Sequence, residues 1–99
     1  MARQFDLYRT ADGSMVLVLQ SDLLKDLNTR AVCLALPVKG GPQAIPALSP
    51  LLSAGDLRVR IAPHLVATLT LIELGAQIAN LSHERDRIIQ SMDLMLTGS

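Results

Sequence analysis

Short stretches of alternating apolar and polar residues begin near the start of the chain, a pattern typical of β-strands that bury one face. Residues 5–9 alternate in this way. Asp12-Gly13 after them predicts a hairpin, because glycine tolerates the positive φ of a tight turn. Residues 15–19 are apolar on both faces, so they predict a strand that is covered on both sides and is therefore central in the sheet. The polar residues 20–22 end this strand.

A proline-rich segment interrupts the pattern in the middle of the chain. Residues 32–36 predict a strand that stops at Pro37, because proline lacks the N–H that a sheet needs. Residues 37–50 hold four of the five prolines together with Gly40-Gly41. This composition predicts a loop rather than a helix or a linker between domains.

Alternation returns after the loop. Residues 56–61 alternate apolar with polar side chains, which predicts a further strand. Pro63 separates it from a second predicted strand over residues 64–72, which ends before Gly75. The apolar residues of this second strand share one face, namely Leu65, Ala67, Leu69 and Leu71.

The last element has helical spacing. Ser82 is a good N-cap, and Glu84 and Asp86 place negative charge in the first turn, where the helix dipole favours it. Gly98 is expected to end the helix. One apolar stripe runs along it, formed by Ile88, Ile89, Met92, Met95 and Leu96. The whole pattern predicts one domain over residues 1–99 of the α+β class, with antiparallel strands closed by a C-terminal helix.

Composition narrows the classes of function. Hydrophobic residues are 49% of the sequence and the mean hydropathy is +0.35, so we expect apolar surface left over for a subunit interface. The nine basic residues balance the nine acidic ones and only 2% of residues are aromatic, which disfavours direct nucleic-acid binding. The sequence shows neither a signal peptide nor an apolar run of the ~20 residues that span a membrane, so we expect a cytoplasmic protein.

Residues that carry chemistry are few. Cys33 lies in an apolar run and is interpreted as a small buried hydrophobe. His64 and His83 lie nineteen positions apart, which excludes the ligand spacing of a zinc site, and each is interpreted as an ordinary residue at the start of an element. Residues 84–87 are a charge run, interpreted as a solvated helix face with weak ion pairs. No catalytic motif, metal site or cofactor site is present in the sequence, so we expect no enzyme activity.

Three stretches in order resemble the CcdB family of toxins from toxin–antitoxin modules. Gln4-Phe5 with Tyr8 is similar to the family's first strand, and residues 18–24 are similar to its Val-Gln-Ser-Asp-Ile-Ile stretch. Residues 78–96 resemble its closing segment, which has a Leu-Ser-His entry to the last helix. The resemblance covers about the first and last 25 residues of the chain.

The resemblance implies both a fold and an activity. The fold would be a small antiparallel sheet of SH3-like barrel type with a long C-terminal helix, working as a homodimer. Family members bind the A subunit of DNA gyrase, trap it on cleaved DNA, and are neutralised by a partly disordered CcdA-like antitoxin. Such a toxin performs no chemistry itself. The gyrase-contacting positions carried over by the resemblance are Leu23, Leu24, Asp93, Leu96, Thr97, Gly98 and Ser99.

The end of the chain departs from the family pattern. Characterised members end in Trp-Gly-Ile and this chain ends in Thr97-Gly98-Ser99, while Asp93 replaces an Asn. The departures leave open a CcdB-fold protein with weak, lost or retargeted gyrase activity, or a scaffold domain without toxicity. A third possibility is a MazF-like endoribonuclease toxin, a class that shares the barrel and cleaves RNA with surface Arg and Thr or Ser. Its candidate residues here are Arg58, Arg60, Thr68 and Thr70.

Overall fold

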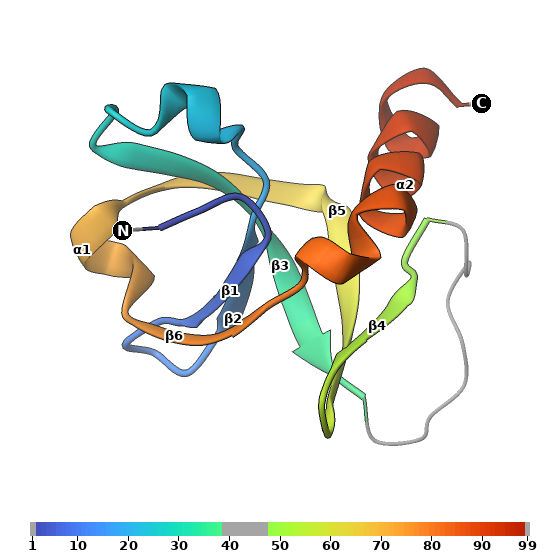
Figure 1. Ribbon diagram of the computed structural model, residues 1–99, viewed down its shortest axis with the longest axis horizontal. Helices are drawn as coiled ribbons and strands as arrows, with labels where there is room; N and C mark the ends of the chain where they lie inside the picture. The colour runs from blue at the N-terminus through green and yellow to red at the C-terminus, as the bar shows by residue number, and fades with distance from the viewer. Residues whose placement is uncertain (1, 39–47, 99) are drawn as a thin grey trace.

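A curled antiparallel sheet carries a C-terminal helix across one face (Figure 1). The structure is a computed structural model that describes residues 2–38 and 48–98. Within these residues the sheet has six strands in the order β4-β5-β3-β2-β1-β6. This arrangement confirms the α+β prediction and the SH3-like sheet. The elements are β1 (Asp6–Arg9), β2 (Met15–Val18), the 3₁₀ turn η1 (Asp22–Leu24), β3 (Thr29–Pro37), β4 (Leu51–Ala54), β5 (Leu57–Thr70), α1 (Leu71–Leu74), β6 (Ala76–Asn80), the 3₁₀ turn η2 (Ser82–Glu84) and α2 (Arg85–Thr97).

The predicted hairpin and central strand are both present. β1 pairs antiparallel with β2, with Leu7 opposite Leu17, and Gly13 in the turn has a φ of 88°. β2 also pairs with β3, and all four of its residues are buried. A strand that is apolar on both faces is therefore covered on both faces, as its pattern predicts.

The sheet buries a separate apolar cluster on each face. The first core packs Leu17 of β2 and Val59 of β5 against Ile88 of α2. The second core lies on the opposite face, where Val16 and Val32 pack with other buried residues. The remaining buried members of the second core are Ala2, Tyr8, Val18 and Leu74.

Cys33 belongs to the first core and is fully buried, which confirms its interpretation as a small hydrophobe. Burial raises the pKa of its thiol to about 12. The thiol therefore stays protonated at neutral pH, and a protonated, buried sulfur has little reactivity.

β5 is one long strand, so the prediction of two strands separated at Pro63 is wrong. Cys33 pairs with Val66 and Leu34 pairs with Ala62, which leaves residues 63–65 as a bulge between them. A proline is tolerated there because the bulged residues make no ladder hydrogen bonds. Figure 1 shows β5 turning sharply within its length.

A short helix, α1, follows β5 where the strand was predicted to continue to residue 72. Thr70 ends β5 and caps α1: its hydroxyl accepts from the Glu73 N–H at 3.2 Å, and the Glu73 carboxylate accepts from the Thr70 N–H at 2.8 Å. Gly75 then ends α1 with a φ of 81°. A Cβ at this position would lie 2.2 Å from the backbone oxygen of Arg9, so only glycine fits.

Two strands were not predicted at all. β6 pairs with β1 at one edge of the sheet, and side chains reinforce the pairing: Gln77 and Asn80 donate to Oδ1 of the buried Asp6 at 2.9 and 2.8 Å. β4 forms the other edge, against β5, directly after the proline-rich segment. The loop predicted over residues 37–50 falls largely on residues 39–47, which lie outside the described residues.

The final helix begins later than predicted. Residues Ser82–Glu84 form the turn η2, and α2 starts at Arg85, so Ser82 is not its N-cap. The backbone N–H of Ser82 instead donates to Oδ1 of Asn80 at 2.9 Å. Gly98 ends the helix as predicted, in the left-handed conformation, and its N–H donates to the carbonyl of Leu94.

Candidate functional site

The turn η1 presents two leucines to solvent. Leu23 is 93% exposed and Leu24 is 51% exposed. Ser21 caps the turn, because its hydroxyl accepts from the Leu23 N–H at 3.1 Å. The Gln20 amide donates to the carbonyls of Leu24 and Thr29, both at 3.2 Å. Local hydrogen bonds therefore hold both leucines in a defined position while leaving them open to a partner.

A buried arginine, Arg30, stabilises the backbone that follows this turn. Arg30 is only 2% exposed, and its guanidinium donates to four backbone carbonyls. The acceptors are Ala2 at 3.1 Å, Leu27 at 2.7 Å, Thr29 at 2.8 Å and Lys25 at 2.9 Å. Lys25 and Leu27 belong to the connection between η1 and β3, and Thr29 is the first residue of β3, so Arg30 fixes that connection. This role could not be predicted from the sequence, because an arginine in a polar connection resembles a solvated one.

The end of α2 carries the second group of predicted site residues. Asp93, Leu96, Thr97 and Gly98 are all exposed, and Leu96 is 69% exposed. The Thr97 hydroxyl donates to the Asp93 carbonyl at 2.7 Å. Ser99 lies outside the described residues.

The structure does not bring the two groups of site residues together within one chain. Figure 1 shows η1 and the end of α2 well apart along the longest axis of the molecule. The positions implied by the resemblance therefore form two exposed patches on the chain, one at η1 and one at the end of α2.

The charge run at the start of α2 has a structural role beyond that of a solvated face. His83 Nε2 donates to the Ser53 carbonyl at 2.6 Å, and Glu84 accepts from the Ser53 N–H at 3.2 Å. Arg87 donates to the carbonyl of Leu51 at 2.7 Å and pairs with Glu84 at 3.7 Å. These contacts join β4 to the beginning of the helix, where His83 is exposed as expected of a residue at the start of an element.

The candidate ribonuclease residues are spread along β5 and are partly occupied by structural contacts. Arg58 and Thr68 are exposed on opposite sides of the bulge at residues 63–65. Arg60 donates to the carbonyl of Ser49 at 2.7 Å, and Thr70 caps α1. Of the four candidates, Arg58 and Thr68 thus remain on the surface of this strand.

No group of three or more His, Cys, Asp or Glu side chains in ranges 2–38 and 48–98 could hold a metal ion. In the same ranges no helix is long and apolar enough to cross a membrane.

Two solved structures share this fold. One is an endoribonuclease in complex with its cognate antitoxin from a mycobacterial species, with a TM-score of 0.79 and 15% identity over 97% of this chain and 95% of that chain. The other is an endoribonuclease from a mycobacterial species, with a TM-score of 0.75 and 14% identity over 96% of this chain and 90% of that chain. At such identities the likeness concerns the fold alone.

The sequence, unlike the fold, identifies a protein family. No curated protein matches the chain. The family model described as CcdB protein matches residues 4–98, which is nearly the whole chain, and the chain therefore belongs to the CcdB family. It is thereby a toxin of the toxin–antitoxin class.

Proposed function

We propose that this toxin acts by binding the A subunit of DNA gyrase, without catalysis of its own, and that a CcdA-like antitoxin neutralises it. The observation that carries the proposal is Leu23, an aliphatic side chain 93% exposed on a capped turn. Burying such a side chain against a partner gains roughly 1.5–3 kcal/mol, and here the turn needs no reordering first. Leu96 offers a second anchor of the same kind at the end of α2.

The antitoxin part of the proposal is supported by the mycobacterial endoribonuclease that shares the fold and is described as in complex with its cognate antitoxin. A partly disordered antitoxin is well suited to a toxin whose exposed apolar side chains lie on several elements. Such a chain can wrap a large surface while folding. The exposed leucines and isoleucines outside the candidate site are Leu27, Leu36, Leu65, Leu71, Ile72 and Ile78.

A homodimer is part of the same proposal. Several large apolar side chains remain exposed in the single chain, among them Ile72 at 94%. A two-fold dimer would bury part of this surface and supply two copies of each patch to one gyrase. Light scattering after gel filtration at micromolar concentration is expected to give twice the chain mass of 10.7 kDa. A mass near 10.7 kDa would contradict the dimer.

An endoribonuclease is the second candidate, favoured by one observation: both solved structures described above are endoribonucleases. The arrangement along β5 supports it less well, because Arg60 and Thr70 already serve structural contacts. Arg58 and Thr68 remain as exposed candidates on either side of the bulge.

One pair of incubations separates the two candidates. The purified chain is incubated with gyrase from its own host and supercoiled DNA, and in parallel with single-stranded RNA. We expect binding to the gyrase A subunit and trapped cleavage complexes, with the RNA intact. Cleaved RNA together with unaffected gyrase would replace the proposal by the ribonuclease.

A further inference from the structure

One residue of the segment before β1, Gln4, contacts three other parts of the chain. Its backbone N–H donates to Oδ1 of Asp22 in η1 at 2.8 Å. Its side-chain amide donates to the carbonyl of Leu19, directly after β2, at 3.0 Å. The same amide accepts from the guanidinium of Arg85, the first residue of α2, at 3.3 Å. Gln4 therefore joins η1, which carries one patch of the candidate site, to the helix that carries the other.

The residue after Gln4 has an uncommon backbone conformation. Phe5 has a φ of 69°, in the left-handed region that bulky residues rarely adopt. Its N–H donates to the Val18 carbonyl at 2.7 Å, its carbonyl accepts from the Leu81 N–H at 2.8 Å, and its ring is buried in the first core. These contacts compensate for the strain. Residues held in such conformations cluster at functional positions, which directs attention to what the strained residue places.

A tight turn over residues 3–6 accompanies the strained residue. The Asp6 N–H donates to the carbonyl of Arg3 at 3.0 Å, and the Arg3 N–H donates to Oδ2 of Asp6 at 2.9 Å. Without this turn the segment would continue in line with β1. The turn and the positive φ of Phe5 together have one local result, which is to place Gln4 against both η1 and α2.

The bond between Gln4 and Asp22 differs in kind from the bonds that shape η1. The bonds from Ser21 and Gln20 described above span at most nine positions, so they hold the turn in its local conformation. The bond from the Gln4 N–H spans eighteen positions. It therefore helps to fix where η1 lies relative to the rest of the molecule, in addition to how the turn is folded.

The bond between Gln4 and Arg85 extends this connection to α2. The Arg85 guanidinium also lies over the Phe5 ring, 5.6 Å from its centroid, which adds a second contact between the same two segments. α2 is one continuous helix from Arg85 to Thr97, so its first turn and its exposed end move together. A residue that joins η1 to the first turn of α2 therefore restricts the position of Leu23 relative to Leu96.

We propose that Gln4 is a positioning residue for gyrase binding, which holds η1 in place against α2 so that the two patches lie at a fixed separation before a partner binds. Gln4 itself touches no partner in this role and acts through Leu23 and Leu24. A partner that contacts both patches then gains affinity, because neither patch has to be ordered on binding. This inference rests on the proposed function, in which the exposed leucines bind the gyrase A subunit.

Hydrogen exchange in the free chain tests the positioning without any partner. Asp22→Ala removes the acceptor of the Gln4 N–H, and Gln4→Met removes both side-chain bonds at similar volume. Each variant is expected to speed exchange roughly fivefold or more at the amides of Leu24 and Lys25, whose hydrogen bonds close η1. Exchange at Val32 in the buried part of β3 should stay unchanged. Asp22→Asn keeps a side-chain oxygen and should restore the native exchange.

Surface plasmon resonance with the gyrase A subunit tests the role in recognition. Gln4→Met should weaken binding roughly fivefold or more in the native chain, but less than about twofold once Leu23→Ala has removed a side chain that Gln4 positions. A general loss of stability would weaken binding by the same factor in both backgrounds. The matched controls are Gln90→Met, on the exposed surface of α2 outside the candidate site, and Asp56→Ala, exposed between β4 and β5. Both should bind within about twofold of the native chain.

The outcomes distinguish this inference from the proposed function. Unchanged exchange at η1 in Gln4→Met and Asp22→Ala, or equal weakening with and without Leu23, would overturn the positioning role and leave gyrase binding intact. If the native chain does not bind the gyrase A subunit, the proposed function fails and the role in recognition fails with it. Faster exchange confined to η1, together with a loss of binding that depends on Leu23, supports the assignment of Gln4.

Discussion

Replacing Arg30 by methionine should lower the free energy of unfolding by about 3 kcal/mol. The guanidinium is buried and serves four backbone carbonyls, and a hydrogen bond to a charged group contributes roughly 1.5–3 kcal/mol. Methionine fills a similar volume but donates to none of the four carbonyls. Some of them will find water, so the total stays well below the sum of four such bonds. Urea unfolding followed by circular dichroism measures the difference.

Arg58→Met is the matched control for this substitution. Arg58 is exposed, so the same change should alter the free energy of unfolding by no more than about 0.5 kcal/mol. Arg30→Lys should lie between the two, because one ammonium group cannot reach acceptors on three sides as a planar guanidinium does. Equal losses for Arg30→Met and Arg58→Met would show that Arg30 does not support the η1 connection.

Restoring the family's terminal residues should raise binding to the A subunit of a gyrase that Trp-ending toxins recognise by roughly tenfold or more. The variant combines Thr97→Trp, Ser99→Ile and Asp93→Asn. A buried tryptophan covers about 150–250 Å² and, at about 25 cal/mol per Å², contributes well over 2 kcal/mol. Thr97 offers much less area, and its hydroxyl already donates to the Asp93 carbonyl. The native chain should therefore poison such a gyrase weakly.

Surface plasmon resonance with the gyrase A subunit and an assay of trapped cleavage complexes measure this gain. Gln90→Trp is the control, because Gln90 is an exposed residue of α2 outside the candidate site. It tests whether any added tryptophan on this helix improves binding. If the native chain poisons that gyrase as strongly as the triple variant, Thr97 is not the deficit, and Leu23, Leu24 and Leu96 carry the contact.

Much of the fold could be predicted because several segments carry a complete local signal. The hairpin at Gly13, the doubly buried β2 and the glycine that ends α2 are each specified by a few neighbouring residues. The family resemblance adds the type of sheet, which is SH3-like and antiparallel, and the long helix that follows it. The exposure of Leu23 and Leu96 was also consistent with the site implied by the resemblance.

The remaining elements depend on contacts between distant residues. β6 has the sequence Ala-Gln-Ile-Ala-Asn, which is poor in β-branched residues, and it is held by the buried Asp6 seventy-one and seventy-four positions away. The continuity of β5 through Pro63 depends on the bulge opposite β3. The start of α2 depends on Asn80 and Ser53, neither of which belongs to the helix. One local signal was overlooked: Thr70 and Glu73 have the spacing of a capping box.

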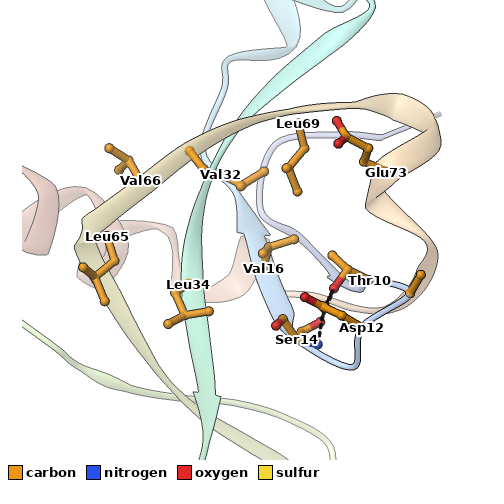
Figure 2. A pocket seen from close by; sticks show the side chains of 12 residues that line it. Thr10, Asp12, Ser14, Val16, Val32, Leu34, Leu65, Val66, Leu69 and Glu73 are labelled. Carbon is orange, nitrogen blue, oxygen red and sulfur yellow. Dashed lines mark hydrogen bonds between the residues drawn. The ribbon is translucent and has the colours of Figure 1, made fainter.

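The face that residues 65, 67, 69 and 71 were predicted to share shows the same division between local and distant information. Alternation correctly placed Ala67 and Leu69 together on one face, whereas Leu65 lies in the bulge and Leu71 lies in α1. However, burial needs a covering element, and only Leu69 of the four packs partly against the second core. Leu65 instead lines an open groove beside Val32 and Leu34 of β3 (Figure 2). Periodicity predicts that side chains point the same way, but not whether another part of the chain lies over them.

The complete burial of Cys33 allows spontaneous opening of the molecule to be followed without denaturant. Its thiol lies on β3, whose other face contributes Val32 to the second core, so a reagent can reach the sulfur only when the sheet separates. With a pKa of about 12 in the folded state, the reactive thiolate is scarce until that happens. The rate of thiol labelling therefore reports the population of opened molecules. A partner that stabilises the closed form would lengthen the labelling time in proportion, and this single native thiol would record the change.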